Sequence, residues 1–285
     1  MQTVDSLTER YSEAFYERLL EESRGSAQEV VPLVVDIVRP GRVIDVGCGI
    51  GTWLAVFRDL GVEHIRGLDG AWVDRQRLLI PESAFEASDL ESLVGVTGSF
   101  DLAISLEVAE HLSPAAGERL VQLLTQVAPT ILFCAAIPDQ GGVYHVNERW
   151  QSYWVERFNA RNFVAIDCLR RRLWHNARVA PYYAQNVFLF VERDYLTTVP
   201  ALNREYERHI FTGPLDVVHP ALFLGAVNRC RKQEVEIAAL EEQRNLLLSV
   251  TPGQVSLKRV LGALPRLLTH ALKRRLHRPL EFRRE

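Results

Sequence analysis

Three glycines and one aspartate alternate in a short segment near residue 50. The segment reads V-I-D-V-G-C-G-I-G over 43–51, and its glycines follow a short β-branched run over 42–46. Glycines at the end of such a run let the backbone turn sharply and let a ligand approach it without a Cβ in the way. In an open α/β sheet, ligands bind where strands end and helices begin. The spacing therefore predicts a ligand-binding loop.

Two common nucleotide-binding loops have a different spacing. A dinucleotide-binding loop needs G-x-G-x-x-G/A, and its third position is Thr52 when counted from Gly47 and Leu54 when counted from Gly49. A P-loop needs Gly-Lys-Ser/Thr after its first glycine, and the segment has no such triplet. The loop is therefore predicted to take a different ligand.

Acidic residues follow three further predicted strands. Asp69 comes directly after 64–68, Asp89 follows 84–87, and Glu107 comes directly after 100–106. A carboxylate can accept charge-assisted hydrogen bonds from two hydroxyls at once. Because ligands bind at the carboxyl ends of strands in such sheets, we expect these acids to line the same site as the glycine loop.

These segments together resemble the class I S-adenosylmethionine-dependent methyltransferases, whose signature is D-x-G-x-G-x-G. The resemblance covers about residues 40–192. It implies that Asp69 binds both ribose hydroxyls, and that Asp89 binds the adenine amino group beside a backbone contact from Leu90. It also implies that 105–107 border the methionine part of the cofactor. The cofactor-binding residues implied in this way are Asp45, Gly47, Cys48, Gly49, Gly51, Asp69, Gly70, Asp89, Leu90, Ser105, Leu106 and Glu107.

A polar and aromatic segment follows the predicted strand at 130–137. It contains I-P-D-Q-G-G, H-V-N-E-R-W and Y-W in this order, and it resembles a bacterial subgroup of these methyltransferases that is tied to glycan or polysaccharide biosynthesis. A segment at the carboxyl end of a strand is expected to lie over the cofactor pocket. The substrate-binding residues expected from it are Asn147, Glu148, Trp150 and Tyr153.

Methyl transfer to a hydroxyl needs a group that accepts a proton, and histidine suits this near neutral pH. His145 and His111 are the candidates, and His145 is preferred because its loop should cover the acceptor. A hydrogen bond from His145 to the backbone, which would only hold the loop, is the alternative. His111 is expected to orient the loop after the fourth strand. The acids Glu107, Glu110, Asp139 and Glu148 lack a tight metal-binding spacing, so no metal is expected.

Strands and helices alternate between residues 42 and 192, which predicts an α/β fold. We expect a Rossmann-like, seven-stranded, mostly parallel sheet with helices on both faces and an antiparallel last strand. The predicted strands are 42–46, 64–68, 84–87, 100–106, 130–137, 163–169 and 186–192. The predicted helices are 1–25, 26–38, 52–60, 114–127 and 148–160, with a loop at 170–185.

The pattern changes after residue 195. We expect a methyltransferase domain with its N-terminal helices at 1–195, and a helical C-terminal extension at 196–285. Helices are predicted at 228–250, which could mediate self-association, and at 257–276. The final 32 residues hold nine Lys/Arg against two Glu, a charge of +7, while the rest carries −10. The basic segment 257–278 therefore predicts peripheral contact with an anionic membrane, with docking on the body or self-association as alternatives.

Composition limits the function further. The 285 residues carry a net charge of −3, and the four cysteines form no C-x-x-C pair. An acidic body with basic residues at one end disfavours a nucleic-acid partner. We expect a cytoplasmic enzyme, at the inner face of the membrane if the tail binds there, that methylates a hydroxyl of a glycan or another small polar metabolite. The alternatives are a natural-product or quinone-type methyltransferase, and a non-catalytic protein that binds the cofactor or a partner through the tail.

Overall fold

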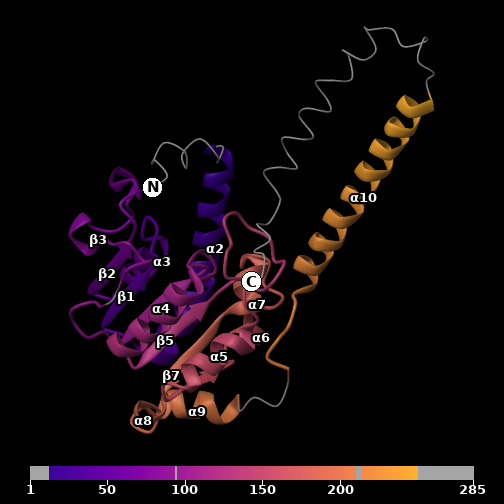
Figure 1. Ribbon diagram of the computed structural model, residues 1–285. Coiled ribbons are helices and arrows are strands. Elements are labelled where there is room, and N and C mark those ends of the chain that lie inside the picture. The colour runs from indigo at the N-terminus through magenta and orange to yellow at the C-terminus, as the bar shows by residue number, and fades with distance from the viewer. Residues whose placement is uncertain (1–12, 94, 210–213, 250–285) are drawn as a thin grey trace. The chain divides into compact units, whose positions relative to one another are not determined.

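One seven-stranded sheet organises the N-terminal part of the chain (Figure 1). The computed structural model describes residues 13–93, 95–209 and 214–249. The strand order is β3-β2-β1-β4-β5-β7-β6, in which β7 is antiparallel to both neighbours and the other pairs are parallel. The strands are β1 (Arg42–Val46), β2 (His64–Asp69), β3 (Phe85–Ala87), β4 (Leu102–Leu106), β5 (Thr130–Cys134), β6 (Phe163–Ile166) and β7 (Phe188–Glu192).

The predicted fold class is confirmed. All seven strands form within their predicted segments or one residue beyond them, and the last is antiparallel. The strands β4 and β5 are buried along their whole length, as expected for central strands covered on both faces. The chain passes from β1 to one side for β2 and β3, and then crosses to the other side for β4. The carboxyl ends of β1 and β4 therefore flank the topological switch point, where ligands bind in such sheets.

Helices cover both faces of the sheet (Figure 1). The helices α2 (Glu13–Val38) and α3 (Thr52–Asp59) pack on one face, and α4 (Pro114–Val127) and α5 (Gln151–Asn159) pack on the other. Alternate residues of β1 serve the two layers, with Val43 in the first and Ile44 in the second. In the second layer the rings of Phe158 and Phe190 stack with centroids 4.0 Å apart.

The expectation of a helix boundary at Ser26 was wrong. The helix α2 runs through this residue without a break, and it also contains Pro32. The Ser26 hydroxyl donates to the Glu22 carbonyl at 2.7 Å and accepts from the Ala180 N–H at 2.9 Å. A serine that bonds back to the preceding turn fits inside a helix, so the capping pattern did not mark a helix start here. Residues 1–12 of the predicted first helix lie outside the described residues.

The segment expected as a loop at 170–185 contains two short helices. These are α6 (Arg170–Leu173) and α7 (Pro181–Asn186). Proline at the first helical position favours a helix start at residue 181. Two helices, α8 (Arg193–Leu196) and α9 (Pro200–Arg208), follow the last strand. The 3-10 turns are η1 (Arg75–Arg77), η2 (Glu82–Ala84) and η3 (Ala109–His111).

The chain divides into two compact units, Met1–Ala226 and Val227–Glu285. The boundary expected after residue 195 stays a prediction. The helix α10 (Pro220–Ser249) begins eight residues before the helix predicted at 228–250. The basic segment 257–278 lies outside the described residues, so its predicted membrane contact stays a prediction, as does self-association through 228–250. Within the described ranges, none of the helices has both the length and the apolar character needed to cross a membrane.

Candidate active site

The glycine loop turns sharply between β1 and α3. Gly47, Gly49 and Gly51 all have positive φ angles, of 90°, 54° and 84°. A Cβ at Gly47 would overlap the Val108 side chain, so this glycine is needed for packing. A Cβ at Gly49 would have no described atom within 4 Å. The loop thus exposes backbone at Gly49 to open space, at the switch point between β1 and β4.

Asp69 connects the end of β2 to this loop. Its Oδ2 accepts a hydrogen bond from the Gly49 N–H at 2.7 Å, and its Oδ1 accepts one from the Gly70 N–H at 2.6 Å. Burial raises the pKa of Asp69, and the two N–H groups oppose that rise. Each oxygen keeps a further lone pair that can accept from a ligand hydroxyl. The carboxyl therefore both holds the loop and remains able to bind a ligand.

Asp45 lies buried beneath the loop. Burial, and then the charge of Asp69, raises the pKa of Asp45 well above its ordinary value. The Cys48 sulfur packs against Gly67 of β2 and is also buried. Ser105 is buried in β4, where its hydroxyl donates to the Val46 carbonyl at 2.8 Å. These predicted cofactor residues thus support the floor of the site.

Asp89 and Leu90 lie after β3, as the resemblance requires. Asp89 is exposed, and it accepts hydrogen bonds from the Glu91 N–H at 3.1 Å and the Ser92 hydroxyl at 2.9 Å. Leu90 is buried. The Asp89 carboxyl therefore stabilises its own turn in the structure, and its role toward adenine stays a prediction.

Trp72 is a candidate ligand contact that was not among the residues predicted from the sequence. This side chain is 62% exposed, and its ring lies so close to Gly70 that a Cβ there would overlap it. A large exposed aromatic ring next to Asp69 is suited to stacking on a flat ligand group. The signal in the sequence was an aromatic residue three positions after the acid that ends β2.

Glu107 begins a cluster of titratable side chains after β4. It has a φ of 58°, and its Oε2 accepts from the Gln140 amide at 2.9 Å. Burial raises the pKa of the Glu107 carboxyl. Glu110 follows in η3 and is fully buried, and burial, together with the charge of Glu107, raises its pKa well above the ordinary value. Two adjacent buried carboxyl groups make this an unfavourable place for negative charge.

Both predicted histidines join this cluster. The rings of His111 and His145 meet edge to face with centroids 4.7 Å apart. The Nδ1 of His145 lies 2.8 Å from the Glu148 Oε1. Burial, and then the charge of His145, lowers the pKa of His111. Glu110, His111 and His145 each bring a potential ligand atom within 4.8 Å of those of the other two.

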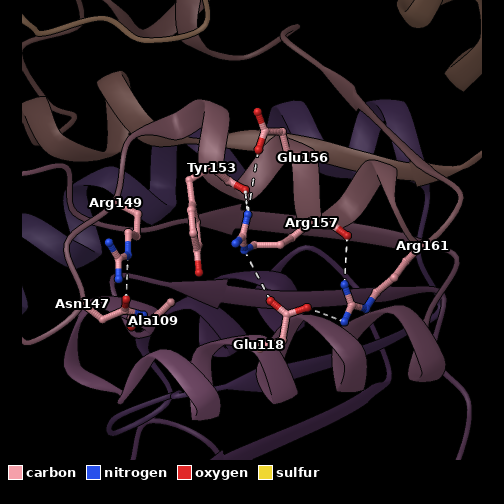
Figure 2. Close-up of polar contacts among 8 residues, drawn as sticks. All are labelled: Ala109, Glu118, Asn147, Arg149, Tyr153, Glu156, Arg157 and Arg161. Carbon is pink, nitrogen blue, oxygen red and sulfur yellow. Dashed lines mark hydrogen bonds and ion pairs between the residues drawn. The ribbon is translucent and has the colours of Figure 1, made fainter.

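The segment expected to bind the acceptor is partly turned inward. Asn147 is buried, its amide donates to the Ala109 carbonyl at 3.2 Å, and its Oδ1 accepts from Arg149 Nε at 3.0 Å (Figure 2). Glu148 is held by His145 and by the Asp139 N–H, which donates to its Oε2 at 2.8 Å. The structure thus uses both side chains within the loop, and their contact with substrate stays a prediction.

Tyr153 and Trp150, the two aromatic residues expected to bind substrate, differ in exposure: Tyr153 is half-buried and Trp150 is exposed. Figure 2 shows the Tyr153 ring beside Arg149 and Arg157. Their guanidinium carbons lie 5.1 Å and 3.3 Å from the ring centroid. Trp150 precedes α5 and is 41% exposed. Of the four expected substrate residues, Trp150 is therefore the one whose side chain is most available to a ligand.

Comparison with known proteins relates more than half of the chain to one family. A family model described as a methyltransferase domain matches residues 14–176. A search of curated protein sequences returned no match.

Several solved structures are similar to the chain. One is an amino pentose methyltransferase from Micromonospora echinaspora, CalS10, with SAM bound (16% identity, TM-score 0.47, 64% of this chain and 98% of that chain). Another is magnesium protoporphyrin IX methyltransferase from Synechocystis with SAH bound (15% identity, TM-score 0.45, 64% and 89%). A third is the methyltransferase domain of bacterial CtHen1 (19% identity, TM-score 0.43, 58% and 97%).

Proposed function

The chain belongs to the methyltransferase-domain family, and on this premise we propose that it methylates a hydroxyl of a sugar, a glycan or another small polar metabolite. S-adenosylmethionine is the cofactor, and it supplies an electrophilic methyl group on a sulfonium centre. The observation that carries the proposal is the open backbone at Gly49, held by Asp69 at the switch point of the sheet. A long polar cofactor can approach such a backbone closely.

The residues around the loop fit the nucleoside part of this cofactor. The free lone pairs of Asp69 can accept from the two ribose hydroxyls. The exposed ring of Trp72 can stack on the adenine, and the segment at Asp89 and Leu90 follows the adjacent strand β3. The methionine part then extends toward Glu107, at the end of β4.

The loop after β5 offers the acceptor a surface of mixed character. Tyr144, Val146 and Trp150 expose 43%, 65% and 41% of their surface, and polar groups lie between them. A sugar ring suits such a surface, because its C–H face packs on an aromatic ring while its hydroxyls bind polar groups. This is the argument for a sugar or a similarly polar acceptor.

His145 is the side chain best suited to take the acceptor proton. Glu148 holds its Nδ1, which leaves Nε2 as the atom that can accept a proton. The rest of the catalytic effect would come from holding the hydroxyl oxygen in line with the methyl group. His111, whose pKa burial lowers, remains neutral beside it.

Two glycine variants test cofactor binding with a matched control. Gly49 and Gly61 both have positive φ, of 54° and 94°, and a Cβ at either would have no described atom within 4 Å. Alanine should therefore cost each about 1–2 kcal/mol of backbone strain. We expect Gly49→Ala to raise the Kd for S-adenosylhomocysteine about 10-fold or more, and Gly61→Ala to leave it unchanged, by isothermal titration calorimetry.

Asp69→Asn provides a second test of the same site. Loss of a charge-assisted hydrogen bond costs about 1.5–3 kcal/mol, so the Kd for S-adenosylhomocysteine should rise about 10- to 100-fold. Methyl transfer is then assayed with S-adenosylmethionine against nucleotide sugars and glycans. A folded wild-type protein that does not bind S-adenosylhomocysteine would overturn the proposal.

A further inference from the structure

We propose that Glu110, His111 and His145 bind a divalent transition-metal cation at the acceptor side of the active site. Each offers a ligand atom within 4.8 Å of those of the other two. Two imidazoles and one carboxylate form a ligand set used by Mn²⁺, Fe²⁺ and related ions. No metal is predicted from the sequence, because the acids of this region lack a tight spacing and the two histidines lie in different segments of the chain.

The first argument is the unsatisfied carboxyl group of Glu110. Its side chain is fully buried, and neither oxygen has a hydrogen bond of standard geometry with the residues that the structure describes. The backbone N–H groups of Glu110 and Ala136 and the Glu107 carboxyl lie close to it without such geometry. Buried polar groups in folded proteins nearly always have a partner, and a buried carboxylate without one is costly. A cation beside it would supply the missing partner.

Glu107 strengthens this argument. One of its oxygens accepts from Gln140, but the other, Oε1, is buried and has no hydrogen bond of standard geometry with the described residues. The side chains of Cys134 and Asn186 lie close to the carboxyl. A divalent cation bound by Glu110 would also offset the negative charge of the neighbouring Glu107.

The second argument is the orientation of His145. Its Nδ1 lies 2.8 Å from a Glu148 oxygen, and the other oxygen of Glu148 accepts from the Asp139 N–H. A histidine that donates one ring N–H to a carboxylate presents the lone pair of its other nitrogen, which is the usual arrangement around a metal. Glu148 is then a positioning residue that acts through His145.

The third argument is that the ligands are held together before any cation binds. Glu110 and His111 belong to η3, and His145 belongs to the loop after β5. The N–H groups of Val146 and Asn147 both donate to the Glu110 carbonyl, at 2.8 Å and 3.0 Å. The two segments are therefore joined at the backbone, which lowers the entropic cost of assembling the site.

A different explanation for the cluster is a proton shared between Glu107 and Glu110. Such a pair would satisfy one oxygen of each acid without a metal and would not require the histidines, but it would leave the second oxygen of Glu110 without a partner. The cation, by contrast, needs His145 as a ligand, so the proton-accepting role proposed above for this residue applies only to the chain without a cation. An oxygen-bearing acceptor could then bind the cation directly, which would favour loss of its proton. Binding of the acceptor oxygen to the cation rests on the proposed methyl transfer, whereas binding of the cation itself does not.

The full chain is first treated with EDTA to remove bound metal and is then titrated with MnCl₂. Free Mn²⁺ is followed by electron paramagnetic resonance, and ZnCl₂ is titrated in parallel by calorimetry. We expect one ion per chain, and a Kd raised about 10- to 100-fold or more in Glu110→Gln and in His145→Gln. His64→Gln is the matched control, because His64 is exposed at the start of β2, and it should bind as wild type does.

S-adenosylhomocysteine binding to the same proteins keeps the two proposals distinct. Binding of this ligand by all variants shows that they are folded, and its failure in wild type overturns the proposed function without affecting the metal result. Glu148→Gln, which alters only the partner of His145, should weaken Mn²⁺ binding by about 10-fold. Wild-type protein that binds neither ion overturns the metal site. So do Glu110→Gln and His145→Gln variants that bind the ions as tightly as wild type does.

Discussion

A variant at Asn147 can distinguish two roles for the loop after β5, which was expected to bind the acceptor. The residue types of the loop predict that Asn147 binds substrate, whereas the structure has its side chain buried and bonded to Ala109 and Arg149 (Figure 2). A substrate-binding role predicts that Asn147→Ala raises KM with little change in stability. An internal role predicts that the free energy of unfolding falls.

The size of that fall follows from the contacts that are lost. The amide bond to the Ala109 carbonyl contributes about 1 kcal/mol, and the bond from Arg149, which is half-buried, contributes about 1 kcal/mol after solvent screening. Removing Asn147 also leaves the Ala109 carbonyl without this donor. We therefore expect a loss of about 2 kcal/mol, or a fall in Tm of about 4–8 °C for a domain of this size.

Thermal unfolding and urea unfolding, followed by circular dichroism, measure the effect. Asn203→Ala is the matched control, because the Asn203 amide makes one exposed hydrogen bond, to Glu207 at 2.9 Å in α9. Its effect should stay within about 0.5 kcal/mol. A variant at Asn147 that is as stable as this control but binds acceptor poorly would refute the reasoning.

Two further variants address the cofactor half of the site. Trp72→Ala should raise the Kd for S-adenosylhomocysteine about 3- to 10-fold through lost stacking, while Trp150→Ala should not; equal effects in calorimetry would count against the nucleoside site. The second variant, Asp45→Asn, tests how the stability of the fold depends on pH. Burial raises the pKa of Asp45 in the folded state, so the folded chain keeps a proton that the unfolded chain releases above about pH 4. Wild type should therefore lose stability as pH rises from there toward the raised pKa, and Asp45→Asn should lack this loss. If Tm changes with pH in the same way for wild type and Asp45→Asn between pH 4 and pH 8, the raised pKa of Asp45 is contradicted.

The sheet was predictable because its signals are local. Each strand has its own apolar run, and turn residues or helical patterns separate the runs. The helix break expected at Ser26 failed for the opposite reason. Its hydroxyl bonds to Ala180, which is 154 residues away in the chain. A local pattern contains no information about such a partner.

Some residues of the candidate site were likewise predictable from local sequence, and others were not. The positions of Gly49 and Asp69 were predictable, since Asp69 ends β2, Gly49 follows the end of β1 by three residues, and parallel strands end at one edge. The inward turn of Asn147 and the pairing of His145 with Glu148 depend on the path of an irregular loop. Trp72 was missed because an aromatic residue in a turn has no periodic signal. The meeting of Glu110 with His145 requires two loops to approach in space.

The position of β7 has a consequence for synthesis of the chain. It is the last strand to be made, yet it lies between β5 and β6 and pairs with both. Until it emerges from the ribosome, β5 presents an unpaired edge and β6 has no neighbour at all. At about 5–20 residues per second, that interval lasts roughly 3–10 seconds for β5. During it the nascent chain displays an apolar strand edge of the kind that aggregates or recruits chaperones, so truncations that end before residue 188 are the ones to avoid in expression work.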